Sequence, residues 1–142
     1  MAIKALAWMV RTFPAPVYCY HEIVHNQQVV QRFEEQGVVF VDDVAEVPHG
    51  RPLMLSAHGS APEVVQAARD NGGFVVDAVC PLVTKVHVEL AKLHKEGYEF
   101  IMIGHKGHPE VEGTMGQLDS GIHLVEDVAD VDRVQPVQTD KL

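Results

Sequence analysis

Long hydrophobic runs are missing from this sequence, which argues against a membrane-spanning protein. No apolar stretch approaches the roughly 20 residues that a membrane-spanning helix needs, although hydrophobic residues make up 46% of the chain. The first residues, MAIKALAWMVRTF, are amphipathic. They lack the uninterrupted apolar core and the small-residue cleavage site of a signal peptide. We therefore expect a cytoplasmic protein that makes no use of a membrane.

Cysteine and basic residues are also scarce. Cys19 and Cys80 are the two cysteines of the chain, and they form neither a disulfide framework nor a C-x-x-C metal motif. Lys and Arg number 11 against 20 Asp and Glu, so the formal net charge is −9. This charge argues against nonspecific binding of nucleic acid or of anionic membranes. A local anion site remains open, because helix N-termini and histidines bind phosphate without a net positive charge.

Strand-like and helix-like segments alternate along the chain. The β-favouring runs are residues 17–20, 38–41, 53–56, 74–76, 100–103 and 122–125, and most are followed by an amphipathic segment. Asn26 has the pattern of a helix N-cap, and the segment from Ser60 to Glu63 has the pattern of a capping box. The alternation predicts an α/β fold with one or two parallel sheets and flanking helices.

The stretch from Phe74 to His87 is predicted to form a buried strand, a short turn and a helix. Pro81 suits the first helical position, and an apolar stripe follows on that helix, made of Val83, Val86, Leu90 and Leu93. Cys80 then lies at the helix N-cap, where backbone N–H groups and the helix dipole favour a thiolate. A thiolate is a nucleophile and a soft-metal ligand, whereas the alternative is a small buried hydrophobe. Cys19, within a strand, is interpreted as structural.

Nine histidines are many for a chain of 142 residues, and several of them follow predicted strands. His21 follows residues 17–20, His58 follows 53–56, and both His105 and His108 follow 100–103. Cys80 follows 74–76 in the same way. Because parallel sheets bind ligands beyond the carboxyl ends of their strands, this shared placement favours a common site. The remaining histidines are interpreted as structural (His25 and His87) or as surface residues (His49, His94 and His123).

The segment from Gly104 to Gly116 is the most specific local feature. Its glycines permit a close approach of a ligand, and Pro109 can begin a helix whose N–H groups face an anion. Glu110 and Glu112 lie beside two histidines, a setting that suits proton transfer by a carboxylate. We expect Glu110 to be the acid, because Pro109 holds it close to a candidate ligand-binding histidine while Glu112 points to the other side of the helix. The alternative is a glycine-rich connection with solvated charges; the pattern is neither a Walker nor a Rossmann motif.

Four motifs in order, YCYHEIVHN, LSAHG, DAVCPLVTKVH and IGHKGHPEVEGTMGQ, resemble the LytB family. These enzymes are 4-hydroxy-3-methylbut-2-enyl diphosphate reductases of the non-mevalonate isoprenoid pathway. The resemblance covers nearly the whole chain and implies three α/β units around an iron–sulfur cluster of the 4Fe-4S type, held by three cysteines. It also implies reductive loss of a hydroxyl group from an allylic diphosphate, which yields isopentenyl and dimethylallyl diphosphates. The electrons would come from a donor such as ferredoxin or flavodoxin.

The resemblance also implies roles for six residues of this chain. They are Cys80 as a cluster ligand, His21, His58 and His108 around the substrate, Glu110 as the proton relay, and Thr139 near the substrate. The family's other two cysteines are missing, and Val79 replaces the threonine usual before the middle cysteine. We therefore expect an incomplete part of a trefoil-like, three-unit enzyme, truncated at both ends. Residues 1–80 would form most of the first unit and residues 81–142 much of the second.

Two other functions stay open on the residues alone. One is a phosphate-binding α/β module without redox chemistry, which would use His21, His58 and His108. The other is a hydrolase with Cys80 as nucleophile and His58 or His108 as its base. Because 4Fe-4S clusters usually need several thiolates, this chain by itself is not expected to hold a stable cluster or to be active.

Overall fold

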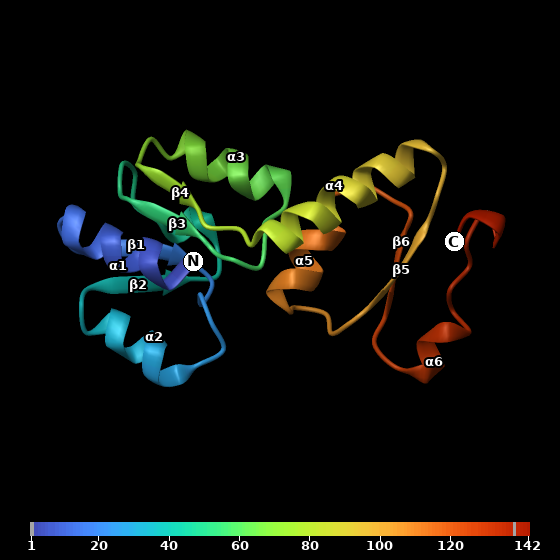
Figure 1. The fold of residues 1–142 in the computed structure, drawn as a ribbon, viewed down its shortest axis with the longest axis horizontal. Coiled ribbons are helices and arrows are strands. Elements are labelled where there is room, and N and C mark those ends of the chain that lie inside the picture. The colour runs from blue at the N-terminus through green and yellow to red at the C-terminus, as the bar shows by residue number, and fades with distance from the viewer. Residues whose placement is uncertain (1, 138) are drawn as a thin grey trace.

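The computed structural model describes residues 2–137 and 139–142, and it contains two parallel sheets joined by a long helix (Figure 1). The first sheet has the order β2-β1-β3-β4 and the second pairs β5 with β6. The strands are β1 (Val17–Tyr20), β2 (Val38–Val41), β3 (Leu53–Leu55), β4 (Val75–Asp77), β5 (Phe100–Ile103) and β6 (Ile122–Val125). The predicted α/β class with parallel sheets and flanking helices is confirmed.

Helices occupy most of the connections between strands. The α-helices are α1 (Ala2–Thr12), α2 (Gln27–Glu34), α3 (Pro62–Asp70), α4 (Pro81–Lys95), α5 (Pro109–Met115) and α6 (Val128–Val131). Two 3₁₀ helices are η1 (Val44–Glu46) and η2 (Thr139–Lys141). Helix α4 runs from the first sheet towards the second, and α5 lies beneath it in the middle of the molecule (Figure 1).

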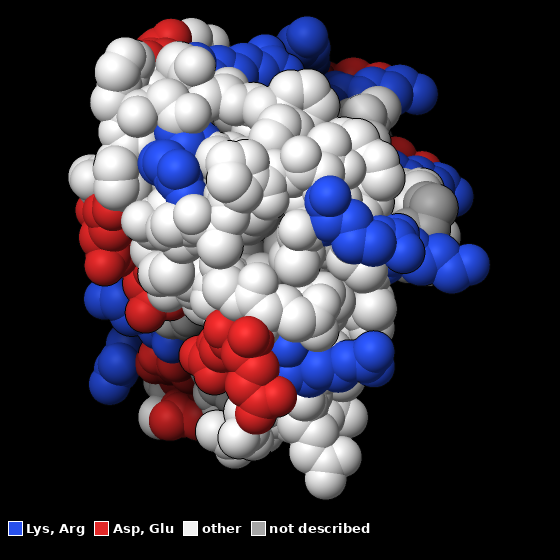
Figure 2. Space-filling view, turned by 90° about the vertical axis from the view of Figure 1, so that its left-hand side faces the viewer, with Lys and Arg blue, Asp and Glu red and all other residues white. Residues whose placement is uncertain are grey.

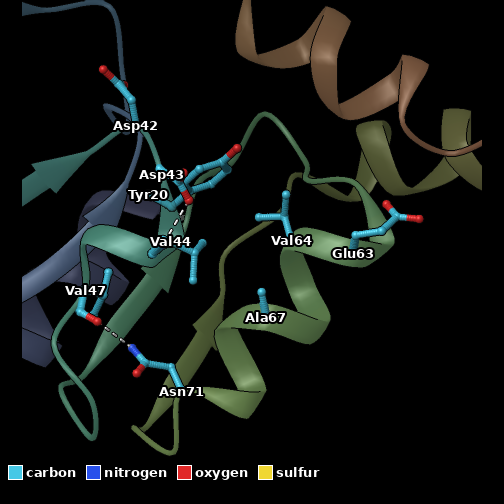
Figure 3. Close-up of a pocket in the computed structure, with 10 residues that line it drawn as sticks. Tyr20, Asp42, Asp43, Val44, Val47, Glu63, Val64, Ala67 and Asn71 are labelled. Carbon is cyan, nitrogen blue, oxygen red and sulfur yellow. Dashed lines mark hydrogen bonds between the residues drawn. The ribbon is translucent and has the colours of Figure 1, made fainter.

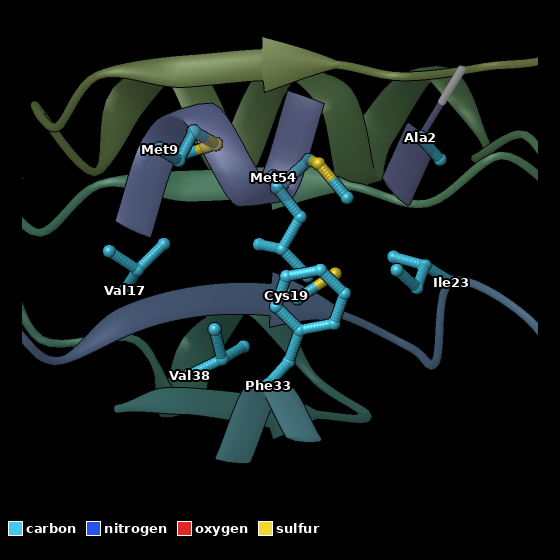
Figure 4. Close-up of a cluster of buried hydrophobic side chains, with 9 residues drawn as sticks. Ala2, Met9, Val17, Cys19, Ile23, Phe33, Val38 and Met54 are labelled. Atoms are coloured by element: carbon cyan, nitrogen blue, oxygen red, sulfur yellow. The ribbon is translucent and has the colours of Figure 1, made fainter. Parts of the chain in front are cut away.

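The first sheet has a hydrophobic core on each face, because successive side chains of a strand point to opposite sides. One core joins α1 and α2 to the odd-numbered positions of β1, and Figure 4 shows Cys19 and Phe33 at its centre. The other joins η1 and α3 to Leu53 and Leu55 of β3. Burial on both faces is typical of a parallel sheet, and it fixes the register that brings the strand ends together.

The predicted capping box before α3 is wrong. The N-cap of this helix is Ala61, which makes no side-chain hydrogen bond, and Pro62 takes the first helical position. The Ser60 carbonyl instead accepts a hydrogen bond from the Gln117 side chain at 3.0 Å. Ser60 therefore belongs to a contact with the segment after α5 rather than to the start of α3.

Two further expectations about burial are wrong in part. Phe74 lies just before β4, at the edge of the sheet, and is half exposed. There its ring packs against Phe13, with 5.0 Å between the ring centroids. On α4, Leu90 is buried but Val86 is half exposed. A single helix over a two-stranded sheet has little apolar surface to cover its stripe, which accounts for this exposure.

Two histidines interpreted as surface residues are partly enclosed. The His123 Nε2 lies 2.7 Å from a carboxylate oxygen of Glu99, and its side chain is 26% exposed. The Nδ1 of His94 is buried and has no hydrogen-bond partner among the described residues. Both belong to the second sheet and its covering helix rather than to the exits of the strands.

The face at the left of Figure 1 is largely uncharged at its centre (Figure 2). Lys and Arg side chains lie mainly at its top and right, and Asp and Glu side chains mainly at its left and lower part. Within residues 2–137 and 139–142, none of the helices is long and apolar enough to cross a membrane.

Candidate functional site

The carboxyl ends of the strands meet at one edge of the first sheet. Tyr20 at the end of β1 is in register with Leu55 of β3, and Leu55 is in register with Asp77 of β4. The segments after these strands carry His21, His58 and Cys80 in turn. The strand register thus accounts for the predicted common placement of the residues that follow the strands of this sheet.

Three imidazole rings form a cluster at this edge. The ring centroid of His25 lies 5.2 Å from that of His58 and 5.4 Å from that of His108, and the last two are 6.1 Å apart. The rings come from three segments distant in the sequence: the loop after β1, the loop after β3 and the residue before α5. The fold therefore brings together two of the three histidines expected around a ligand, and adds His25.

His21 lies beside this cluster rather than in it. Its Nδ1 lies 3.1 Å from Asp42 Oδ1, and its ring centroid lies 4.0 Å from that of Tyr20, with the two rings tilted by 43°. It also lines a cavity of about 320 Å³ with Pro109 and Glu112. The backbone of His21 has a φ of +59°, which turns the chain sharply after β1. The predicted ligand contact of His21 stays a prediction.

The sequence places His25 near the site but favours a structural role for it, because it lies at a probable helix start; in the structure its ring belongs to the cluster. The loop after β1 carries the buried side chain of Ile23, and Asn26 ends it by capping α2. These two anchors hold His25 between them and leave its ring next to those of His58 and His108. A histidine immediately before a helix N-cap, in a loop that starts at the carboxyl end of a strand, is the signal that could have identified it.

Burial makes His58 a poor site for a proton. His58 is only 8% exposed, and its Nδ1 is buried without a hydrogen-bond partner among the described residues. Burial lowers the pKa of His58 below its ordinary value of 6.5, and the neighbouring His25 and His108 lower it further, while Glu110 acts in the opposite direction. A buried imidazole with a free ring nitrogen is well suited to bind a polar ligand.

His108 is the N-cap of α5, and this fixes its tautomer. Its Nδ1 accepts a hydrogen bond from the Glu110 N–H at 3.2 Å, so the ring proton lies on Nε2. The Glu112 N–H is likewise satisfied by the His108 carbonyl at 3.0 Å. The predicted anion contact through the first N–H groups of α5 is therefore weakened, because His108 itself takes up two of them.

The two carboxylates of α5 have different surroundings. Glu112 accepts a hydrogen bond from the Gly107 N–H at 2.8 Å. Glu110 is exposed, follows His108 closely, and acts electrostatically on His58. Glu110 is thus the carboxylate beside the histidine cluster, whereas Glu112 is bonded to the loop. The assignment of Glu110 as the proton donor stays a prediction that this geometry favours.

The two cysteines lie in unlike environments. Cys80 is the N-cap of α4, as predicted, and is partly exposed. Its N–H donates to the Ala57 carbonyl at 3.0 Å, which ties it to the segment that carries His58. It lines a cavity of about 280 Å³ together with Ile23 and Val24. Cys19 is fully buried, and burial raises the pKa of its thiol far above the usual range.

Thr139 does not join the other predicted site residues. It lies in η2, at the far end of the second sheet (Figure 1). In the same short helix, the Lys141 carbonyl accepts a hydrogen bond from the Glu99 N–H at 2.8 Å, and the Lys141 Nζ donates one to the Glu96 carbonyl. These bonds hold the segment against the turn between α4 and β5, away from the three histidine rings.

Two glycines let helices approach the loop that carries His58: Gly113 admits α5, and Gly59 admits His87 of α4. A Cβ atom built on Gly113 would lie 2.7 Å from the Gly59 carbonyl oxygen, and one on Gly59 would lie 2.7 Å from the His87 ring. Gly59 also has a φ of +86°, which favours glycine. This close contact sets α5 directly beside residues 58–60 and thereby places His108 near His58.

A separate cavity of about 600 Å³ lies between η1 and α3 (Figure 3). Its polar groups hold the local structure: Asp43 caps η1, and the Asn71 side chain donates to the Val47 carbonyl at 3.1 Å. Figure 3 shows Asp42 and Glu63 at its margins, apart from one another. None of the six predicted site residues lines it, so we place the candidate site at the histidine cluster.

The fold and the cluster define an α/β protein with a candidate ligand site at the carboxyl ends of parallel strands. Comparison with known proteins identifies the family: the sequence profile of LytB protein matches residues 1–142. The chain belongs to the LytB family.

Close relatives carry one name. The chain is 60% identical over 141 residues to the 4-hydroxy-3-methylbut-2-enyl diphosphate reductase of Polaromonas sp. (strain JS666 / ATCC BAA-500), a match that covers 99% of this chain and 42% of the relative. It is 58% identical to the reductase of the same name from Methylibium petroleiphilum, a match that covers 99% of this chain and 43% of that relative. The chain thus spans about two fifths of the length of these relatives.

A solved structure has the same fold over nearly the whole chain. It is the E-1-hydroxy-2-methyl-but-2-enyl-4-diphosphate reductase from Plasmodium falciparum, with a TM-score of 0.87 and 40% sequence identity. The match covers 94% of this chain and 42% of that one.

Proposed function

We propose that this chain is part of an iron–sulfur reductase that converts 4-hydroxy-3-methylbut-2-enyl diphosphate to isopentenyl and dimethylallyl diphosphates. The observation that carries the proposal is the cluster of His25, His58 and His108, at the edge where Cys80 begins α4. Membership of the LytB family and relatives named as this reductase support it.

The histidine cluster would hold the diphosphate of the substrate. The buried Nδ1 of His58 has no hydrogen-bond partner among the described residues, and the His108 Nε2 carries a proton available for donation. Polar ligands are bound by such convergent groups in partly enclosed sites. His21, beside the cluster, would take part through its neighbouring cavity. Thr139 would require a different arrangement of the C-terminal segment to reach this ligand.

Glu110 would deliver the proton to the departing hydroxyl group. Glu110 is exposed, and its backbone N–H donates a hydrogen bond to the His108 ring. It also lies within electrostatic range of His58. An exposed carboxylate beside a bound substrate can exchange protons with solvent and pass them on. Glu112, whose carboxylate accepts the Gly107 N–H, is less free to do so.

The iron–sulfur cluster fits this chain only in part. Cys80 suits one ligand position, because it is a free thiol at a helix N-terminus that faces a small cavity. Within residues 2–137 and 139–142, no group of three or more His, Cys, Asp or Glu side chains is arranged so that it could hold a metal ion. The remaining thiolates would have to come from outside this sequence. When bound, such a cluster supplies electrons and an iron for the substrate hydroxyl.

A reductase of this kind would bind an allylic diphosphate and an electron donor such as ferredoxin or flavodoxin. We expect it to bind neither nucleic acid nor a membrane. A net charge of −9 supports the exclusion of nucleic acid. Two free thiols, one of them partly exposed, suit the reducing cytoplasm, where we place the protein.

A chimeric enzyme tests the function directly. The matching segment of the Polaromonas reductase is replaced by this chain, and turnover of 4-hydroxy-3-methylbut-2-enyl diphosphate is measured anaerobically with pre-reduced enzyme. We expect turnover and a brown chromophore in the parent chimera, and loss of both in Cys80→Ser. Glu110→Gln should lower turnover about 10²–10⁴-fold and keep the chromophore, and Glu112→Gln should cost much less. A folded chimera without turnover, or equal losses in the two glutamate variants, would contradict the assignment.

A further inference from the structure

The segment between β5 and α5 is held by two carboxylates from different elements. Glu112, in α5, accepts a hydrogen bond from the Gly107 N–H at 2.8 Å, and Glu126, after β6, accepts one from the Lys106 N–H at 2.7 Å. Gly107 has a φ of +85°. Turns of this kind present successive N–H groups to an anion, and here the anions are side chains of the protein itself.

This segment leads directly into His108. The His108 N–H donates to the His105 carbonyl at 3.1 Å, and the Glu112 N–H donates to the His108 carbonyl at 3.0 Å. Glu112 is therefore bonded to the segment twice, by its side chain at Gly107 and by its backbone at His108. Two bonds from one residue to two consecutive positions hold the backbone from which the His108 ring extends.

We propose that Glu112 is a positioning residue that keeps the His108 ring in the histidine cluster by accepting the Gly107 N–H. What it supplies is an acceptor oxygen rather than a negative charge. Glu112 is exposed, so its charge is screened by solvent, and a negative charge close to a diphosphate would oppose binding. A glutamine of the same length keeps an acceptor oxygen for Gly107 and lacks the charge. The proposal rests on the proposed function in that the cluster is taken to bind a diphosphate.

The experiment compares Glu112→Ala with Glu112→Gln in the full 142-residue chain. Calorimetry measures the affinity for inorganic pyrophosphate, and NMR measures the hydrogen exchange of the Gly107 amide and the ring shifts of His108. Glu112→Ala should raise both the exchange rate and the dissociation constant about tenfold, the order expected for one lost hydrogen bond. Glu112→Gln should stay within about twofold of the parent chain. Glu89→Ala, at an exposed residue paired with Lys85 on α4, is the matched control and should change neither quantity.

Gly107→Ala provides an independent route to the same result. A Cβ atom at Gly107 would meet nothing within 4 Å, but its positive φ is strained for alanine. This variant keeps Glu112 and should still weaken pyrophosphate binding and move the His108 ring shifts. Parent-like behaviour of Glu112→Ala and Gly107→Ala would overturn the proposal, and so would a Glu112→Gln variant as weak as Glu112→Ala. If the parent chain binds no pyrophosphate, the proposed function fails. The amide exchange and ring shifts still decide the positioning role.

Discussion

At the scale of single residues, the two thiols differ in access to solvent. Cys19 is fully buried, its Sγ donates to the His21 carbonyl at 3.3 Å, and burial raises the pKa of its thiol. Cys80 is partly exposed at the N-terminus of α4. Since the thiolate is the reactive species, we expect iodoacetamide to modify Cys80 at least about tenfold faster than Cys19 in the native chain.

Mass spectrometry of the alkylated peptides measures this difference across pH. Cys80→Ser should abolish the rapid phase, and Cys19→Ser should leave it unchanged. Faster labelling of Cys19 than of Cys80 would show that the assignment of structural and functional cysteine is reversed.

His58 links the stability of the fold to pH. Its pKa in the folded chain is lowered below 6.5, chiefly by burial, so the unfolded state binds more protons than the native state below that pH. The contribution of His58 to the free energy of unfolding is therefore fully present above pH 6.5 and is lost as the pH falls below that value. Each such histidine contributes at most about 1.4 kcal/mol per pH unit. His87, whose pKa burial also lowers, adds to the same loss.

Urea unfolding between pH 7.5 and 5 measures this slope. His58→Gln should flatten the decline, and His105→Gln, at an 85% exposed side chain, should leave it as it is. An equal decline in the parent chain and in His58→Gln would rule out His58 as a source of the pH dependence.

At the scale of elements, the contact between α5 and the loop after β3 depends on the small size of Gly113. A Cβ atom there would lie 2.7 Å from the Gly59 carbonyl oxygen, which is backbone and cannot turn aside. We expect Gly113→Ala to lower the free energy of unfolding by about 1–3 kcal/mol, as for other overpacked sites. It should also weaken pyrophosphate binding, because α5 would carry His108 away from His58.

Chemical denaturation and calorimetry measure the two effects of Gly113→Ala. Lys92→Ala, at an exposed position of α4, is the control and should change stability by less than about 0.5 kcal/mol. Unchanged stability and binding in Gly113→Ala would mean that the close approach of α5 is not required.

The helices and strands show which features can be predicted from the sequence and which cannot. The strand and helix alternation gave the right elements because burial on both faces of a parallel sheet leaves a strong local pattern. The predicted start of α3 is wrong because it depends on a contact between distant segments, in which Ser60 is held by Gln117. The anchors of His25, Ile23 and the cap of α2, are local and leave a pattern in the sequence. The approach of the His58 and His108 rings to His25 joins distant segments and leaves none.

At the scale of the whole molecule, this chain supplies one suitable cysteine for a cluster. Because 4Fe-4S clusters usually require several thiolates, we expect little iron to remain after anaerobic reconstitution and desalting of the 142-residue chain. Iron analysis and visible absorption measure this, with Cys80→Ser as the background. Retention of about four irons per chain would contradict the expectation and would require ligands other than cysteine.

The most direct test of the account is whether one diphosphate-sized anion engages all three rings of the cluster. The chain is labelled with ¹⁵N at histidine and titrated with pyrophosphate, and the ring signals are followed by NMR at pH 6 and pH 8. We predict that the signals of His25, His58 and His108 shift together with a single dissociation constant. That constant should be smaller at pH 6, because protonated imidazole favours the anion. The signals of His49 and His123 should stay in place. Shifts confined to other histidines, or no shift in the cluster at millimolar pyrophosphate, would contradict the central claim.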